Sequence, residues 1–377
     1  MSELNSKDLT RTNAERVARP AILEVVSDCD ARADLTAASD IRSGLGGVFD
    51  AHLARMGDSC PPIVGHSDTH WISGEGLTVQ ADLAALFARV PLDIVHTHRA
   101  DDLAIVGAAA REAGVPCLVH TICGEFAMAE QPKVERLIEL ADVYGAVLVA
   151  PSFEVAQRLK SVKNIAIVPR SIDCSRYQPD SPAKARQKIG LPEEPRVIGC
   201  ASPVSNLETL FLALTRLEPD IHVALFGPAS PGAAERSMIR ALDLEERVHV
   251  LGGWALPELV HQAIDIYYHG PSDDCSPRPV LAAQACGKPV VAAYPTKAEF
   301  LCPQTGYLLP AQFLPALVST LKQALSNSPT LTARSFVEKN WNLSSSIGIY
   351  ESVLRSAVQN SLGDQESGYD AAAGGAG

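Results

Sequence analysis

The stretch that decides the fold spans residues 270–291 and reads GPSDDCSPRPVLAAQACGKPVV. The apolar run Ile264–Tyr268 leads into it, so the pattern predicts a strand end, a short loop, one helix and then the next strand. Pro279 suits the first turn of that helix, and Gly287 suits the position just past its end. On a parallel sheet such a turn is a usual ligand site, because strand carboxyl ends and helix amino ends meet there.

The same alternation of short apolar runs and helices of about 10–14 residues extends outward through the chain and predicts a parallel α/β sheet in each half. The expected strands are residues 21–26, 63–64, 92–98, 115–122, 146–150 and 165–169, then 196–200, 221–227, 248–252, 264–268, 290–293 and 306–309. Between the halves, residues 171–195 are polar and suit a linker. Gly44 to Gly47 are expected to open a helix over Val48–Met56.

Length and composition are those of a globular protein with two domains: 377 residues, 46% hydrophobic and 20% charged. The 32 Lys and Arg residues against 44 Asp and Glu residues give a net charge of −12. An acidic chain has no general electrostatic attraction for nucleic acid, so we expect no nucleic acid partner.

The nine cysteines form no C-x-x-C pair and are odd in number, so we expect buried free thiols in a reducing compartment. Residues 1–20 are polar and read as a flexible leader, not as a signal peptide. No run of about 18 apolar residues predicts a membrane span. We therefore expect a cytoplasmic protein, with peripheral association with a membrane left open.

Residues 270–291 also resemble the motif P-S-x-x-E-G-F-P-x-x-L-x-E-A-x-A-x-G-x-P-V-V of the retaining GT-B glycosyltransferases of glycosyltransferase family 4. With the frame fixed at Ala285–Val291, the first glutamate of that motif falls on Asp274 and the second on Ala282. Other segments similar to the family are Asp93–His98, Ala113–Pro116, Val149–Ser152, Val168–Asp173, and Glu299 followed by Gly306.

This resemblance implies the GT-B fold, in which two Rossmann-like domains with parallel sheets face a cleft and C-terminal helices cross back to the first domain. The expected division is a leader over 1–20, an acceptor domain over 21–180, a nucleotide-sugar domain over 181–345, a crossing helix over 346–360 and a disordered tail over 361–377.

The resemblance also implies that the donor is a nucleotide-diphosphate sugar bound as a substrate, with no separate cofactor. Residues expected to bind the donor are Gly46, Gly47, Ser202, Asp274, Ser276, Arg278 and Glu299. Asp274 would contact the sugar. The Gly46–Gly47 pair would let the backbone approach phosphate or acceptor, and a plain loop at the start of a helix is the alternative.

Several chemical positions depart from the family motif. Ala282 cannot accept the ribose hydrogen bonds of the second glutamate, a loss of about 1.5–3 kcal/mol. Residues 201–206 lack the Arg and Lys that neutralise the leaving diphosphate, and this charge stabilisation is often the largest catalytic term. Arg278, beside the expected amino end of a helix, is a candidate replacement, and a solvated surface base is the alternative.

His96 and His98 follow each other at the carboxyl end of a predicted strand. There they would line the cleft and orient a hydroxyl group, as candidate catalytic residues together with Asp274. A structural role is equally open. The H-x-H spacing also suggests a metal site. The sequence shows no further ligand cluster beside it, and the family needs no metal, so no metal is expected.

Three functions remain open from the sequence. The first is a hexosyltransferase that moves a hexose from a nucleotide-diphosphate sugar to a polysaccharide, lipid-linked or small-molecule acceptor with retention. The second is a catalytically inactive GT-B protein that binds or scaffolds a partner glycosyltransferase in glycan synthesis, which Ala282 and the missing cations favour. The third, a sugar-nucleotide epimerase, would need a fuller set of carboxylates and histidines.

Overall fold

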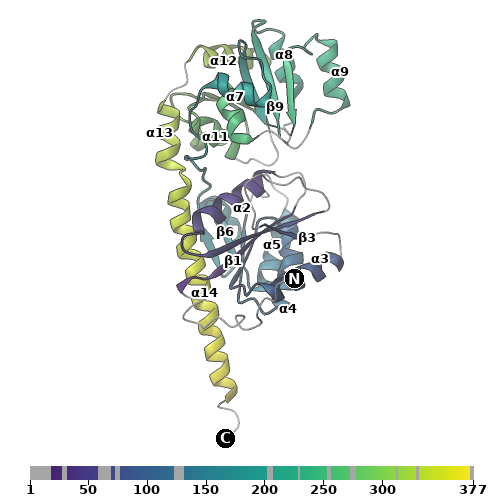
Figure 1. Ribbon diagram of the computed structural model, residues 1–377. Coiled ribbons are helices and arrows are strands. Elements are labelled where there is room, and N and C mark those ends of the chain that lie inside the picture. The colour runs from purple at the N-terminus through teal and green to yellow at the C-terminus, as the bar shows by residue number, and fades with distance from the viewer. Residues whose placement is uncertain are drawn as a thin grey trace. The chain divides into compact units, whose positions relative to one another are not determined.

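The computed structural model describes residues 18–27, 32–57, 69–72, 77–122, 131–201, 207–227, 230–252, 256–271, 277–310, 313–327 and 331–373. The chain forms two compact units, one of residues 1–169 and 344–377 and the other of residues 170–343 (Figure 1). The domain boundaries were expected after residues 180 and 345. The structure divides the chain after residues 169 and 343, which is 11 and 2 residues earlier. Most of the predicted leader, residues 1–17, lies outside the described residues.

Within its described residues the first unit has a seven-stranded parallel sheet in the order β3-β2-β1-β4-β5-β6-β7. The strands are β1 Ala21–Ser27, β2 Asp50–Met56, β3 Thr69–Ile72, β4 Ile94–Thr97, β5 Cys117–Thr121, β6 Val147–Ala150 and β7 Ile165–Ile167. The helices are α2 Arg32–Leu45, α3 Leu77–Arg89, α4 Ala100–Glu112, α5 Gln131–Tyr144, α6 Phe153–Arg158 and α14 Leu343–Ala373, of which residues from Ser344 belong to this unit.

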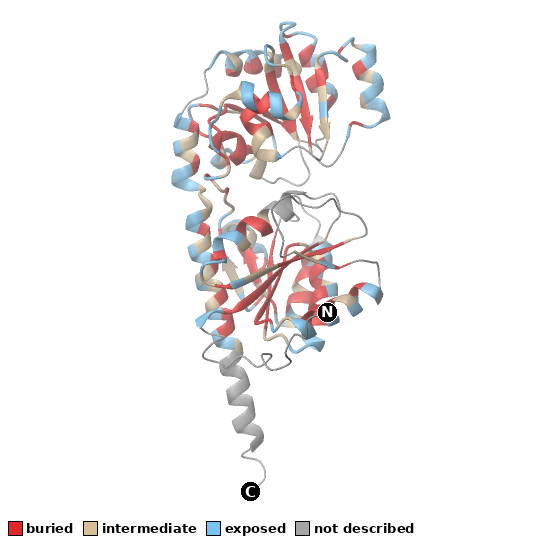
Figure 2. Cartoon of the chain, in the orientation of Figure 1, coloured by how far each residue is buried: buried red, intermediate tan, exposed pale blue. Residues whose placement is uncertain are grey.

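Both faces of this sheet are buried, as a parallel sheet covered by helices requires. Leu23 and Val95 belong to a core shared with α3, α4 and α5, whereas Ile22 and Ile94 pack with Leu354 and other residues of α2 and α14. Figure 2 shows the buried residues concentrated on the strands and the adjoining helices of each unit. Because side chains alternate along a strand, neighbours at even spacing from Ile22 and Ile94 share the face that α14 covers.

The second unit, within the described residues, has a six-stranded parallel sheet in the order β10-β9-β8-β11-β12-β13. Its strands are β8 Arg196–Ala201, β9 Ile221–Phe226, β10 Val248–Gly252, β11 Ile266–His269, β12 Val290–Ala293 and β13 Gly306–Leu309. Its helices are α7 Pro182–Ile189, α8 Leu207–Leu214, α9 Ala233–Ala241, α10 Pro257–Ala263, α11 Arg278–Ala285, α12 Leu314–Ser326 and α13 Leu331–Asn340, with a 3-10 turn η1 at Ala298–Phe300. The predicted class, α/β with two parallel sheets, is confirmed.

One predicted element has the wrong type. Residues Val48–Met56 were expected to be helical, but Asp50–Met56 form β2, which pairs with β1 along its whole length, from Ala21 opposite Asp50 to Ser27 opposite Met56. The helix lies earlier, at Arg32–Leu45, where Ala38, Ile41 and Leu45 are buried at helical spacing. Pairing with a distant strand therefore overrides the local pattern of Val48–Met56. The expected strand at residues 63–64 lies outside the described residues.

Two segments expected to be irregular contain helix. The predicted linker holds α7, which ends at Gly190 in a left-handed conformation with φ 74°. The predicted disordered tail, residues 361–377, continues α14 as far as Ala373. Residues 361–373 include no proline, and the helix accommodates Gly363 and Gly368. Among the described helices, none combines the length and the apolar character that a membrane span requires.

Candidate active site

The stretch that organises the second unit has the predicted local structure. α11 begins at Arg278 with Pro279 in its first turn, and Gly287 follows its end with φ 77°. The carbonyls at the end of α11 accept from the N–H groups of Cys286 and Gly287. Residues 272–276, which include Asp274 and Ser276, and residues 202–206, which include Ser202, lie outside the described residues. The structure therefore brings Arg278 to the amino end of a helix and does not place those three.

Arg278 is half-buried at the amino end of α11. The helix packs against β11 and β12, whose carboxyl ends lie at the same edge of the sheet. The first backbone N–H groups of a helix have no partner within the helix, and they favour an anion. A guanidinium and a helix amino end at this edge are a chemically suitable cradle for phosphate.

Ala282 is not placed at a surface. It is 2% exposed and packs in an apolar cluster with Ile172, Tyr177 and Val337, among other residues. The face of α11 that carries Ala282 therefore contacts α13 and the segment before α7. A ligand cannot reach this side chain without displacing the cluster, so alanine here is a packing residue.

Glu299 is exposed on η1, and a residue absent from the predicted site holds this turn in place. Gln284 in α11 is fully buried; its Nε2 donates to the Phe300 carbonyl at 2.7 Å and its Oε1 accepts from the Cys302 N–H at 2.6 Å. A glutamine among the apolar residues Val280–Ala285 was the available sequence signal for Gln284.

His269 ends β11 and was also missed. It is 6% exposed, its Nδ1 lies 3.4 Å from the Tyr267 hydroxyl, and burial lowers its pKa to about 4. The side chain is therefore a neutral imidazole at neutral pH, able to accept or donate one hydrogen bond beside α11.

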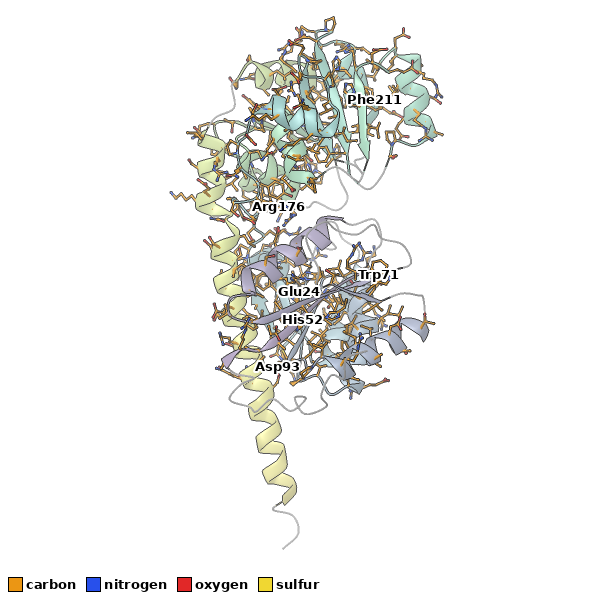
Figure 3. All side chains as sticks on the ribbon, viewed as in Figure 1. Glu24, His52, Trp71, Asp93, Arg176 and Phe211 are labelled. Carbon is orange, nitrogen blue, oxygen red and sulfur yellow. The ribbon has the colours of Figure 1, made fainter. Side chains whose placement is uncertain are left out.

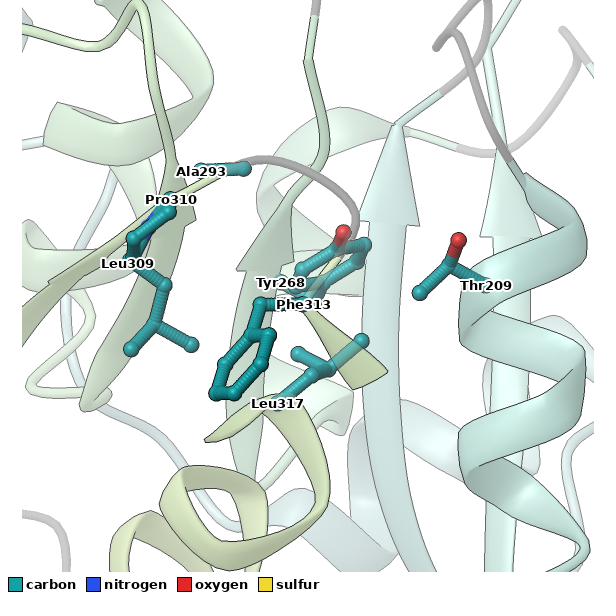
Figure 4. A pocket seen from close by; sticks show the side chains of 7 residues that line it. All are labelled: Thr209, Tyr268, Ala293, Leu309, Pro310, Phe313 and Leu317. Carbon is teal, nitrogen blue, oxygen red and sulfur yellow. The ribbon is translucent and has the colours of Figure 1, made fainter. Parts of the chain in front are cut away.

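A small pocket also lies in this unit (Figure 4). Its lining is mainly apolar and comes from Thr209, Tyr268, Ala293, Leu309, Pro310, Phe313 and Leu317. It has room for about one water molecule. A sugar would not fit it, so it is a packing gap between the sheet and its helices.

In the first unit, His96 and His98 form a compact cluster with Glu24 of β1. His96 Nδ1 lies 2.9 Å from Glu24 Oε2, and His98 Nε2 lies 2.7 Å from the same oxygen. The two imidazole rings are 4.4 Å apart between centroids. All three side chains are 0% exposed. Both histidines lie at the carboxyl end of β4 as predicted, but in this structure they are enclosed and not open to solvent; Figure 3 places Glu24 in the sheet.

The cluster continues through two hydroxyl groups to α14. His96 Nε2 lies 2.8 Å from Thr121 Oγ1 of β5, and this oxygen lies 3.0 Å from the Tyr350 hydroxyl. On the opposite face of the sheet, His120 Nδ1 meets Thr97 Oγ1 at 2.9 Å. His120 therefore lies in a contact separate from the cluster of Glu24, His96 and His98.

The charge states follow from burial and from the contacts. Burial lowers the pKa of His96, while Glu24 raises it. Burial by itself raises the pKa of Glu24, but His96 and His98 outweigh it, so this carboxyl group is ionised. Nearby, burial raises the pKa of Asp102 to about 6, although the Ser27 N–H that it accepts opposes the shift.

The Gly46–Gly47 pair lies in the turn between α2 and β2. A Cβ atom added at Gly47 would meet no atom within 4 Å, and one at Gly46 would lie 3.5 Å from the nearest. Neither glycine is required by packing. By contrast, a Cβ atom on Gly44 would lie 2.5 Å from Cδ1 of Ile347 in α14. The helix-start alternative for the pair is wrong, because a strand follows it.

Comparison with known proteins agrees with this architecture. Residues 182–340 match the family Glycosyl transferases group 1. A D-inositol 3-phosphate glycosyltransferase of Mycolicibacterium gilvum is 28% identical over 239 residues, which cover 59% of this chain and 49% of the relative. The chain thus spans about half the length of this curated relative.

Solved structures of similar fold cover most of the chain. The Anabaena protein Alr3699/HepE, solved with UDP and glucose, superposes with a TM-score of 0.72 at 19% identity, over 90% of this chain and all of that chain. A sucrose-phosphate synthase from Thermosynechococcus elongatus superposes with a TM-score of 0.66 at 16% identity, over 90% of this chain and 99% of that chain. The chain therefore has the fold of GT-B glycosyltransferases, and its residues 182–340 match the family Glycosyl transferases group 1.

Proposed function

We propose that this protein is a glycosyltransferase that transfers a hexose from a nucleotide-diphosphate sugar to a polysaccharide, lipid-linked or small-molecule acceptor, with retention of configuration. The observation that carries the proposal is the family match, which lies entirely within the second unit and includes α11 and residues 270–277 before it. The glycosyltransferase relatives and the UDP-bound structural neighbour support the same class of donor.

The donor is assigned to the second unit. Its diphosphate binds at the amino end of α11, where Arg278 adds a positive charge to the helix dipole. This pairing replaces the Arg and Lys that residues 201–206 lack, and it stabilises the charge that develops on the departing diphosphate. Asp274 contacts the hexose, and Ser202, Ser276 and Glu299 complete the donor site in this proposal.

Ribose recognition differs from that of the family motif, because Ala282 is buried and carries no carboxylate. We expect donor affinity to depend more on phosphate contacts than on the ribose. The acceptor is assigned to the first unit, where the turn at Gly46 and Gly47 leaves room for close approach of a ligand to the backbone. For His96 and His98 we give a different role below.

Thermal unfolding of the full chain with UDP, GDP, ADP and their sugars tests the proposal. A ligand that binds only the folded state raises the midpoint temperature, so at least one nucleotide should do so. Arg278→Gln should reduce that rise, whereas Arg216→Gln, an exposed arginine in the same unit, should leave it unchanged. No rise with any nucleotide at millimolar concentration would contradict a working donor site.

Turnover separates an enzyme from an inactive binding protein. Release of nucleoside diphosphate from the stabilising donor, increased by an acceptor, supports transfer, and the anomeric configuration of the product tests retention. Stabilisation by a donor without release, across glycan, lipid-linked and small polyol acceptors, would favour the scaffolding function instead.

A further inference from the structure

The cluster of Glu24, His96 and His98 gathers donor atoms of the kind that bind a metal ion. Each residue offers one donor atom, and the three atoms lie within 4.8 Å of one another. The positions are set by strand pairing, since Glu24 of β1 lies opposite His96 of β4. Side chains two residues apart share a face, so His98 joins the same group. The sequence alone showed the H-x-H pair but not the third ligand, which lies 72 residues before His96.

The charge of the cluster favours a cation. All three side chains are 0% exposed, and among the described residues the ion pairs of Glu24 are those with the two histidines. The buried carboxylate brings a negative charge into a region of low dielectric, and such a charge is costly unless it is paired. A divalent cation bound by these atoms would compensate that charge.

The surrounding groups orient the ligands as the partners of metal-bound histidines do. If His96 binds metal through Nδ1, its Nε2 must carry the proton, and Thr121 Oγ1 lies 2.8 Å away to accept it. Thr121 is in turn held by the Tyr350 hydroxyl at 3.0 Å. This arrangement fixes both the tautomer and the ring orientation of His96.

The distances are close to those required. Two ligands of tetrahedral Zn²⁺, each bonded at about 2.0–2.1 Å, lie about 3.3 Å apart. The Glu24 oxygen now lies 2.9 Å from His96 Nδ1 and 2.7 Å from His98 Nε2, so the atoms must separate by about 0.4–0.6 Å.

We propose that Glu24, His96 and His98 bind one divalent transition metal ion of the zinc class. Two imidazoles and one carboxylate suit Zn²⁺ or Co²⁺ better than Mg²⁺ or Ca²⁺, which prefer oxygen ligands. The ion binds the folded first unit and stabilises it, because the unfolded chain has no preformed site. The metal site lies within the first unit, and the nucleotide site is proposed for the second unit.

The test uses the full chain after treatment with a chelator, then titrated with Zn²⁺ or with Co²⁺. We expect one ion per chain, visible d–d absorption from bound Co²⁺, and a midpoint temperature higher by roughly 5–10 °C at 100 times the dissociation constant. Mg²⁺ should give no rise. A stoichiometry near zero with either Zn²⁺ or Co²⁺ would overturn the proposal.

Variants locate the bound ion. Glu24→Gln and His98→Gln should each abolish the Co²⁺ absorption, with far-UV circular dichroism verifying the fold. Thr121→Val keeps all three ligands and should weaken the affinity by about 10–100-fold.

The matched control is His222→Gln in the second unit. His222 is partly exposed, and its Nδ1 lies 2.9 Å from Nε2 of His249, so the variant breaks a histidine pair away from the proposed site. This variant should bind Co²⁺ as the wild type does. Retention of the ion by folded Glu24→Gln, or its loss in His222→Gln, would overturn the proposal.

Discussion

The side-chain Oε1 of Gln284 accepts a hydrogen bond of 2.6 Å from the backbone N–H of Cys302. The same side chain donates from Nε2 to the Phe300 carbonyl at 2.7 Å, so one buried glutamine joins α11 to the turn that carries Glu299. The link matters because α11 and that turn are both parts of the proposed donor site.

Gln284→Leu should leave the Cys302 N–H and the Phe300 carbonyl buried without these partners. We expect the free energy of unfolding to fall by about 1–3 kcal/mol, measured by urea denaturation. Gln323→Leu, at an exposed position of α12, is the control and should change it by less than about 0.5 kcal/mol. Equal effects of the two variants would show that the Gln284 contacts contribute nothing.

Arg334 connects three backbone segments of the second unit. Its guanidinium donates to the carbonyls of Cys174, Tyr177 and Ala285 at 2.9–3.1 Å and pairs with Glu338 at 2.8 Å. Lysine cannot reproduce this planar fork, so Arg334→Lys should destabilise the protein by about 2–4 kcal/mol. Glu338→Gln removes only a partly exposed ion pair and should cost less than about 1 kcal/mol. A larger loss in Glu338→Gln would reverse this ranking.

Ala282→Glu restores the residue of the family motif at a site that the structure fills with apolar side chains. Burying a carboxylate there should lower stability by about 3 kcal/mol or more, without strengthening nucleotide binding. Thermal unfolding with and without UDP measures both effects. Ala241→Glu, at the exposed end of α9, is the control. Tighter nucleotide binding by a stable Ala282→Glu protein would show that this position faces the donor.

Gly44 and Gly47 differ in what surrounds them, although they lie three residues apart. Gly44→Ala places a methyl group 2.5 Å from Ile347 Cδ1, so we expect a loss of about 1–3 kcal/mol. Gly47→Ala meets open space and should change stability by less than about 0.5 kcal/mol. If the turn contacts a ligand, Gly47→Ala should lower kcat/KM at unchanged stability. Unchanged kcat/KM would remove Gly47 from the proposed site.

The protein should lose stability on acidification because of buried neutral histidines. Burial lowers the pKa of His261 and of His269 to about 4. The unfolded chain, with histidine pKa values of about 6.5, therefore binds more protons between these limits. The stabilising contribution is complete above about pH 6.5 and declines as pH falls toward 4, by about 1.4 kcal/mol per pKa unit and histidine.

Urea unfolding of wild type and His269→Gln at about pH 7 and pH 5 measures the contribution of His269 to the pH dependence of the free energy of unfolding. The variant should lose less stability between the two pH values than the wild type does. The raised pKa of Asp102, about 6, has the opposite effect and makes the folded state less stable as pH rises from about 4 to 6. Both proteins contain Asp102, so its contribution cancels in the comparison. Equal losses in both proteins would mean that His269 does not titrate in this range.

Much of the fold could be predicted because its signals are local. Pro279 and Gly287 limit α11, and the apolar run at Val290 and Val291 forms β12, as expected. Residues Val48–Met56 were assigned the wrong element because their pattern alone does not reveal pairing with β1. The motif located α11 correctly, but nothing local indicated that Ala282 would be covered by Tyr177 and Val337.

By itself, the sequence determined the two parallel sheets and the turns that limit α11, because each depends on short-range periodicity and turn chemistry. Its resemblance to the motif of glycosyltransferase family 4 indicated the class of protein that residues 182–340 match. Only the tertiary structure decided that Glu24 meets His96 and His98, and that Gln284 holds the Cys302 backbone. These contacts join residues 18 to 74 positions apart in the sequence. Their physical cause is strand register and helix packing, which bring distant residues together and which no local pattern specifies.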